Sequence, residues 1–357
     1  MVNVRGLSRD LIIHPGETLK EALVEKQMTQ KELPARTGRS EVQVSRVVTG
    51  APITPDFAKK LEYVLDIPAY FWNNIQKNYD QELADYKDRH SISENEQRIY
   101  VKIKNVLEQF LEVLGLEPEK DEVFGIVQAR KFLKVANLGL ITEPELSVAY
   151  RTANYGKTDE HINYVWNKLC DAHLEKYEAK PFLGIEKLME VIPEIKSMMF
   201  EKNINCSVKN LQNLFSDLGV RFAVVRHYKG APHHGRVSRN SKDGIDICVT
   251  IRQGRVDIFW FSLFHEIAHI LNGDLDKEIY SAKDDLEANR LAESLLIPCE
   301  DYNKFKQQAD FSLSSIIEFA KRVGVPSFTV IGRLQNDKLL RWSSYRKQIR
   351  YLKWKDK

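Results

Sequence analysis

Cysteine is scarce in this sequence, and its cysteines are far apart. The 357 residues include four cysteines, and no two of them lie at Cys-x-x-Cys spacing: Cys170, Cys206, Cys248 and Cys299. A disulfide framework is therefore not expected, and free thiols are typical of proteins in the reducing cytosol.

Long hydrophobic runs are also missing. Residues 1–6 show no apolar segment followed by a cleavage site. The most apolar stretch, Ile258–Leu271, is shorter than the roughly 20 residues that span a bilayer, and it contains two histidines and a glutamate. We therefore expect a cytoplasmic protein that has no membrane partner.

A large excess of charge of one sign is the third absence. The 53 basic and 50 acidic residues leave a net charge of +3, which excludes a uniformly basic nucleic-acid coat protein and an acidic disordered chain. Local basic patches are still allowed. A hydrophobic content of 43% in a chain of this length predicts two or three globular domains.

The order of helical and strand patterns predicts three regions and a mostly helical α+β fold. Residues 1–86 read as an all-α unit, and residues 87–215 as a helical linker divided by glycines and prolines. Residues 216–357 begin with β patterns at 220–225 and 245–251, and helices at 257–272, 282–296 and 312–323 follow. This last region is expected to be an α+β domain with a small sheet.

The first motif consists of two short helices joined by a tight turn. Thr29 and Glu32 have capping-box spacing, Gly38 marks the turn, and Ser40 opens a third helix that ends near Thr49. Pro34 predicts that the helix at 29–36 is kinked or short. This pattern is typical of a helix-turn-helix, but it also fits a solvated helical hairpin, and spacing alone does not separate the two.

Residues 14–82 resemble the helix-turn-helix of the HigA antitoxin family, which is of the Cro/repressor type. The resemblance rests on these segments: His14–Lys20, Thr29–Leu33, Ser45–Gly50, Ile53–Ala58, Leu61–Glu62 and Pro68–Trp72. It implies a homodimer that binds a palindromic double-stranded operator, with a toxin as a possible partner. Side chains of suitable chemistry for DNA contacts lie in and before the third helix: Gln30, Arg39, Ser40, Gln43 and Arg46.

The second motif is His265-Glu266-x-x-His269. Positions i and i+4 of a helix lie one above the other, so both histidines can reach one metal ion, and Glu266 beside them can take a proton from a metal-bound water. The alternative is a pair of hydrogen-bonded core histidines. On the next acidic helix, Asp285 and Asn289 share one face, so one would bind the metal while the other orients a histidine ring.

Residues 257–335 resemble the ImmA/IrrE family of zinc metallopeptidase-like domains. The resemblance rests on the segments Asp257–Leu271, Glu287–Ala292, Leu295–Pro298 and Val330–Gln335. It implies a Zn²⁺ site held by His265, His269 and Asp285, with Asp285 where the family usually has glutamate, and with Asn289 behind the ligands. Glu287 points about 200° away from Asp285 and is expected to be solvated.

Two functions follow from these resemblances together. In the first, a DNA-binding regulator carries a peptidase domain in which Glu266 acts as general base and cleaves a repressor or partner protein. In the second, an antitoxin-like repressor uses a non-catalytic zincin-like domain to bind a partner or ligand.

Two further features leave alternatives open. The strand at 245–251 would be either an edge that accepts an extended peptide or an ordinary buried strand. His233 and His234 would either belong to a surface loop or supply an oxyanion donor to the cleft.

Overall fold

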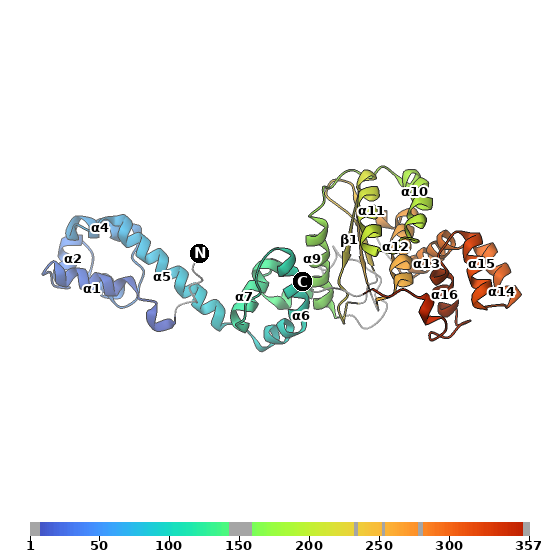
Figure 1. The fold of residues 1–357 in the computed structure, drawn as a ribbon. Coiled ribbons are helices and arrows are strands. Elements are labelled where there is room, and N and C mark those ends of the chain that lie inside the picture. Colours follow the sequence, from blue (N-terminus) through green and yellow to red (C-terminus); the bar gives the residue numbers. More distant parts are fainter. Residues whose placement is uncertain (1–7, 143–158, 232–234, 252–253, 278–280, 353–357) are drawn as a thin grey trace. The chain divides into compact units, whose positions relative to one another are not determined.

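The computed structural model describes residues 8–142, 159–231, 235–251, 254–277 and 281–352 (Figure 1). These residues form fifteen α-helices and one three-stranded sheet, which confirms the predicted, mostly helical α+β fold. The chain divides into two compact units, one made of Met1–Glu94 with Asp121–Val127 and the other of Asn95–Lys120 with Gln128–Lys357. The three-region division at 86 and 215 stays a prediction.

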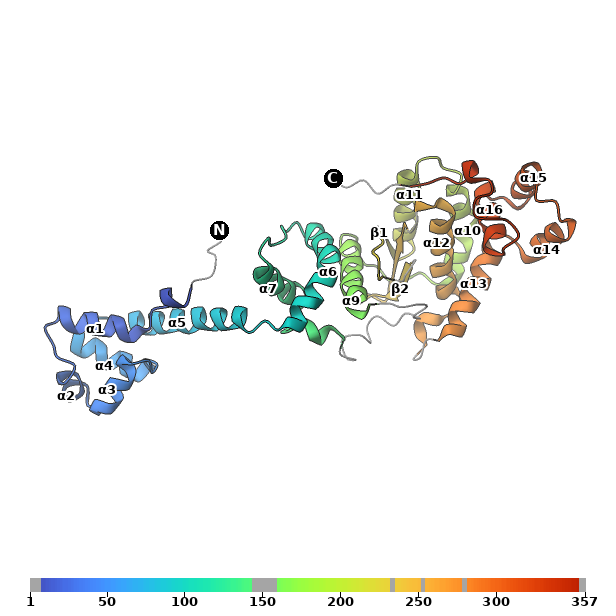
Figure 2. The same ribbon diagram turned by 90° about the horizontal axis from the view of Figure 1, so that it is seen from below.

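The first unit is built from five helices around one small core (Figure 2). Its largest fully buried side chains come from different helices: Leu19, Leu33, Leu61 and Trp72. The helices are α1 (Pro15–Glu25), α2 (Glu32–Thr37), α3 (Glu41–Val48), α4 (Pro55–Leu65) and α5 (Ala69–His90).

Local capping sets the start of the short helices in this unit. Ser40 and Gln43 form a reciprocal capping box at the start of α3, and Thr54 caps α4. Helix α2 is short, as predicted, but it begins at Glu32, so Pro34 lies in its first turn. The first four amides of a helix have no intrahelical acceptor, and Pro34 therefore costs no helical hydrogen bond.

The second unit begins with helices that surround a buried ion pair. The Glu96 carboxylate is fully buried and accepts hydrogen bonds from Arg130 Nε and from the Leu138 amide, both at 2.9 Å. These contacts join α6 (Glu94–Val113), α7 (Glu122–Leu133) and the 3₁₀ helix η2 (Leu138–Thr142).

A three-stranded sheet lies at the centre of the second unit, in the order β1-β3-β2. Strand β3 (Ile245–Thr250) pairs in parallel with β1 (Val220–Val225) and antiparallel with β2 (Gly235–Arg239). All six β3 residues are buried. The alternative in which 245–251 is an edge is therefore wrong, and β2 is an edge strand instead.

Helices cover both faces of this sheet (Figures 1 and 2). Helix α9 (Glu160–Leu174) lies on one face, and α10 (Ile185–Met198), α11 (Ile204–Asp217) and α12 (Val256–Leu271) lie on the other. Helix α12 is apolar nearly all round, so it is buried between the sheet and the helices that follow it: α13 (Ala282–Leu296), α14 (Cys299–Gln308), α15 (Leu313–Val323) and α16 (Ser327–Asn336).

The sequence predicts neither a disulfide framework nor a membrane-spanning segment. All four cysteines are free thiols, and Cys170 and Cys248 are buried. Within the described part of the chain, no helix has the length and apolarity needed to cross a bilayer.

Candidate functional sites

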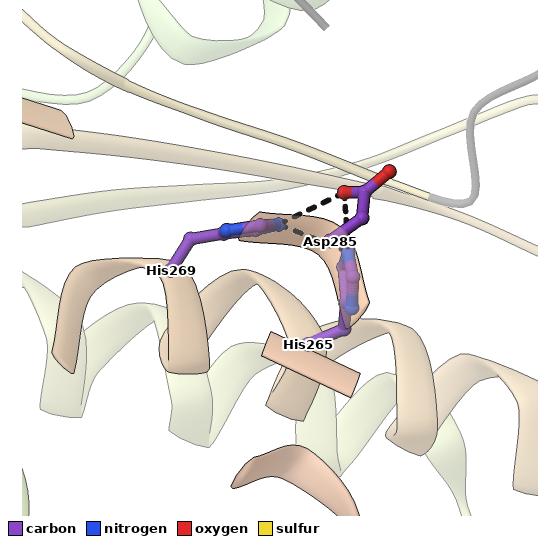
Figure 3. A group of neighbouring side chains, drawn as sticks. All are labelled: His265, His269 and Asp285. Carbon is purple, nitrogen blue, oxygen red and sulfur yellow. Dashed lines mark hydrogen bonds and ion pairs between the residues drawn. The ribbon is translucent and has the colours of Figure 1, made fainter. Parts of the chain in front are cut away.

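Helices α12 and α13 bring together three side chains that could hold a metal ion (Figure 3). His265 and His269 lie one turn apart on α12, and their rings point towards the same space. A capping box between Ser281 and Asp284 starts α13, which places Asp285 in the first turn of that helix and directs it at both rings.

The donor atoms are close enough to share one ion. His265 Nε2 lies 3.0 Å from His269 Nε2, and Asp285 Oδ1 lies 3.4 Å from His269 Nε2 and 3.6 Å from His265 Nε2. Zinc–nitrogen bonds of about 2.0–2.1 Å allow two ligands of one ion to be at most about 4.2 Å apart. All three pairs meet that limit, so the residues fit a metal ion.

Asp274 orients the second histidine. Its Oδ2 accepts a hydrogen bond of 2.7 Å from His269 Nδ1, so the ring proton is at Nδ1 and the Nε2 lone pair faces the other two ligands. From the sequence, Asn289 is expected to orient a histidine ring behind the ligands. Asn289 is half-buried one turn after Asp285, and among the described hydrogen bonds none joins it to a histidine.

The sequence held a signal for Asp274 that was missed. Gly273 ends α12 with a left-handed φ of 72°, and the chain turns back into the 3₁₀ helix η5 (Asp274–Asp276). An acidic residue directly after such a glycine can fold onto the last turn of the helix, where His269 lies.

His265 has a buried nitrogen without a partner. Within the described residues, its Nδ1 makes no hydrogen bond, although the side chain is largely buried. A metal ion bound at Nε2 would leave this Nδ1 without a partner as well, so the atom does not separate the two alternatives. The observation that favours a metal site is the convergence of both Nε2 atoms with the Asp285 carboxylate.

Glu266 is buried beside the cluster. Burial raises the pKa of its carboxyl group, the two histidines oppose this, and the charge of Asp285 adds to it. Gly235, the first residue of β2, lies so close that a Cβ atom there would overlap the Glu266 carboxylate. The absence of a side chain at position 235 thus provides the space for this carboxylate.

The charges around the histidines suit a cation. Burial alone would lower the pKa of His269, but Asp285, Glu266 and Asp274 raise it above its usual value. Three carboxylates thus surround two imidazoles. Glu287, by contrast, is exposed on α13, in agreement with the solvated position expected for it. Its Oε1 lies 3.6 Å from Lys283 Nζ.

The candidate DNA contacts lie on the first unit. Gln30, Ser40, Gln43 and Arg46 are exposed, and Arg46 makes no ion pair within the described chain. Ser40 and Gln43 use part of their hydrogen-bonding capacity on each other's backbone amides. Arg39 is paired with Asp56 and lies 5.7 Å from the centre of the Phe57 ring, so tertiary contacts hold it. His233 and His234 lie outside the described residues.

The chain is similar to one known protein family in part of its length. Residues 256–335 match the IrrE N-terminal-like domain. The matched span begins with α12 and ends in α16, and it contains His265, Glu266, His269 and Asp285. No curated protein matches this chain.

Proposed function

We propose that the second unit is a zinc-dependent peptidase and that the first unit is a HigA-like DNA-binding domain, which together form a transcriptional regulator. The observation that carries the enzymatic part is the convergence of two histidine Nε2 atoms and one carboxylate oxygen beside the buried Glu266. The match to the IrrE N-terminal-like domain supports this assignment.

His265, His269 and Asp285 would hold the zinc ion. When bound, zinc lowers the pKa of a water molecule and polarises the peptide carbonyl group. Glu266 would take a proton from the attacking water molecule, and it would then give that proton to the leaving amine nitrogen as the C–N bond breaks. A carboxyl group whose pKa is raised by burial suits a group that first accepts a proton and then returns it.

An extended segment of a protein substrate suits the open edge of the sheet. Strand β2 pairs only with β3 among the described strands, and its first residue, Gly235, contacts Glu266. A peptide that adds to β2 would have its backbone amides paired and would pass near the general base. The substrate would be a repressor or a partner protein.

The regulatory part of the proposal rests on α3. Arg46 is exposed and carries an unpaired guanidinium in the described structure, and Gln43 lies one turn before it. These side chains suit guanine and adenine edges in the major groove. A homodimer would bind two half-sites of a palindromic operator, and a toxin is a candidate partner.

A second function is favoured by Asp285. Where the family usually has glutamate, this chain has the shorter aspartate, which would weaken metal binding if the helices did not adjust. In that case the protein is an antitoxin-like repressor in which the zincin-like domain binds a partner or ligand without catalysis.

Two measurements separate these functions. Elemental analysis of the purified chain should give about one zinc per chain, lost in His265→Ala and retained in Glu287→Gln. N-terminal labelling of proteins from cells that produce the wild type or Glu266→Gln should then show cleavage sites that depend on Glu266. A metal-free wild type contradicts the zinc site, and identical labelling with bound zinc supports the non-catalytic function.

A further inference from the structure

One lysine connects the two sides of the metal centre. Lys277 follows η5, and its Nζ lies 2.5 Å from Asp274 Oδ1 and 2.5 Å from Asp284 Oδ1. Asp274 lies behind the α12 ligand His269, and Asp284 directly precedes the α13 ligand Asp285. The ammonium group is therefore bound by one carboxylate from each side.

The second oxygen of each carboxylate accepts hydrogen bonds from other groups. Asp274 Oδ2 accepts from His269 Nδ1, and Asp284 Oδ2 accepts from the backbone amide and hydroxyl of Ser281 at 2.7 and 2.6 Å. The first contact sets the ring of a metal ligand, and the second sets the start of the helix that carries another ligand. Lys277 fixes both carboxylates through their remaining oxygens.

The carboxylates of this pairing are largely buried, although the Lys277 side chain is 37% exposed. The side chains of Asp274 and Asp284 are 2% and 11% exposed, so each needs a counter-ion or hydrogen-bond donors. The η5 turn is also tied to β2, because Arg239 contacts both oxygens of Asp276 at 2.7 and 2.8 Å. Loss of Lys277 would therefore leave the turn attached while it released the link between α12 and α13.

We propose that Lys277 is a positioning residue that sets the separation and orientation of the metal ligands by joining η5 to α13. This inference rests on the zinc site of the proposed function. Neither resemblance assigns a role to this residue, and it is not a metal ligand itself, since its ammonium has no lone pair.

Zinc affinity tests the proposal in the purified full-length chain. The zinc Kd would be measured by competition with a chromophoric chelator for the wild type and for Lys277→Met. We expect the variant to bind zinc about 10-fold or more weakly, in the range for residues that orient metal ligands. Lys277→Arg, which keeps the charge and donors, should restore affinity to within about threefold of the wild type.

Three further measurements distinguish positioning from a general effect on stability. Lys283→Met removes a lysine that pairs with Glu287 on the exposed face of α13, and it should leave the zinc Kd unchanged. Asp284→Asn keeps an acceptor for Ser281 but weakens the Lys277 contact, and it should weaken zinc binding like Lys277→Met. The absorption spectrum of the cobalt(II) form should change in Lys277→Met and stay the same in Lys283→Met.

The measurements distinguish a failure of the proposed zinc site from a failure of the role proposed for Lys277. If the wild type binds no zinc, the proposed metal site itself fails. If the wild type binds zinc and Lys277→Met has the same Kd and the same cobalt spectrum, the role of Lys277 is overturned and the zinc site stands.

Discussion

Gly235 on β2 lies against the carboxylate of Glu266 on α12, and the backbone there approaches so closely that even a methyl group would overlap it. This relationship couples an edge strand to the proposed general base. It also separates catalysis from metal binding, because the three atoms nearest to a Cβ at position 235 all belong to Glu266.

Gly235→Ala should therefore slow proteolysis strongly without removing the metal. A displacement of the base by about 1 Å would lower the rate about 100-fold, whereas the zinc content should stay at the wild-type level. N-terminal labelling and elemental analysis measure the two quantities. Ser238→Ala on the same strand is the control. Loss of zinc together with activity would show that the alanine disturbs the whole centre.

Asp274→Asn should weaken zinc binding by about 10- to 100-fold, because the carboxylate that orients His269 becomes a neutral amide. The measurement is chelator competition on the purified chain. Asp276→Asn is a matched control in the same turn, since Asp276 pairs with Arg239 and not with a ligand. Equal zinc affinity of Asp274→Asn and the wild type would contradict the orienting role.

His173 should make the metal-free chain less stable in mild acid. Burial, with a smaller contribution from Lys176, lowers the pKa of His173 to about 4. In the unfolded chain the pKa of His173 is near 6.5, so the unfolded chain binds a proton more readily than the folded chain. The free energy of unfolding should therefore fall as the pH decreases from about 6.5 towards about 4. Melting curves at pH 7.5 and pH 5 should show a smaller difference for His173→Gln than for the wild type. The same difference in both would refute the assignment.

Arg130→Met should destabilise the second unit strongly. It leaves the fully buried Glu96 carboxylate without its cationic partner, and breaking a buried pair in this way costs about 3–5 kcal/mol. Urea unfolding followed by circular dichroism measures the change. The matched control is Lys102→Met, which removes a half-exposed ion pair with Asp159 and should cost about 1 kcal/mol or less.

Arg46→Ala tests the DNA-reading surface. If Arg46 contacts a base, the variant should bind DNA from the region upstream of its own gene about 1–3 kcal/mol more weakly, with reduced sequence preference. Fluorescence anisotropy with a scrambled fragment as competitor provides the measurement. Arg36→Ala is the control, because Arg36 lies on α2 near Glu32. An unchanged affinity and footprint would remove Arg46 from base recognition.

The parts of the candidate centre that depend on local periodicity are predictable from the sequence. The spacing of His265 and His269 fixes their common face once the segment is a helix, and the acidic start of the next helix supplies Asp285. Asp274 was missed, since its position depends on the turn at Gly273 and not on helix spacing. The same limit applies to Arg39, whose partner Asp56 comes from another helix.

The sheet shows why strand order could not be derived in the same way. The residues of 245–251 alternate too little to distinguish a central strand from an edge, and the position of β3 depends on pairing with both β1 and β2. Those pairings join segments that are distant in sequence. A pattern within one strand therefore predicts its conformation but not its neighbours.

The span that matches the IrrE N-terminal-like domain starts at Val256, yet α12 buries one side against strands that precede this residue. A truncation at Val256 would remove β1, β2 and β3 together with Gly235 and Arg239, and it would uncover the side of α12 that contacts β2 and β3. The smallest fragment that folds around the metal centre should therefore begin before α9, about a hundred residues upstream of the matched span.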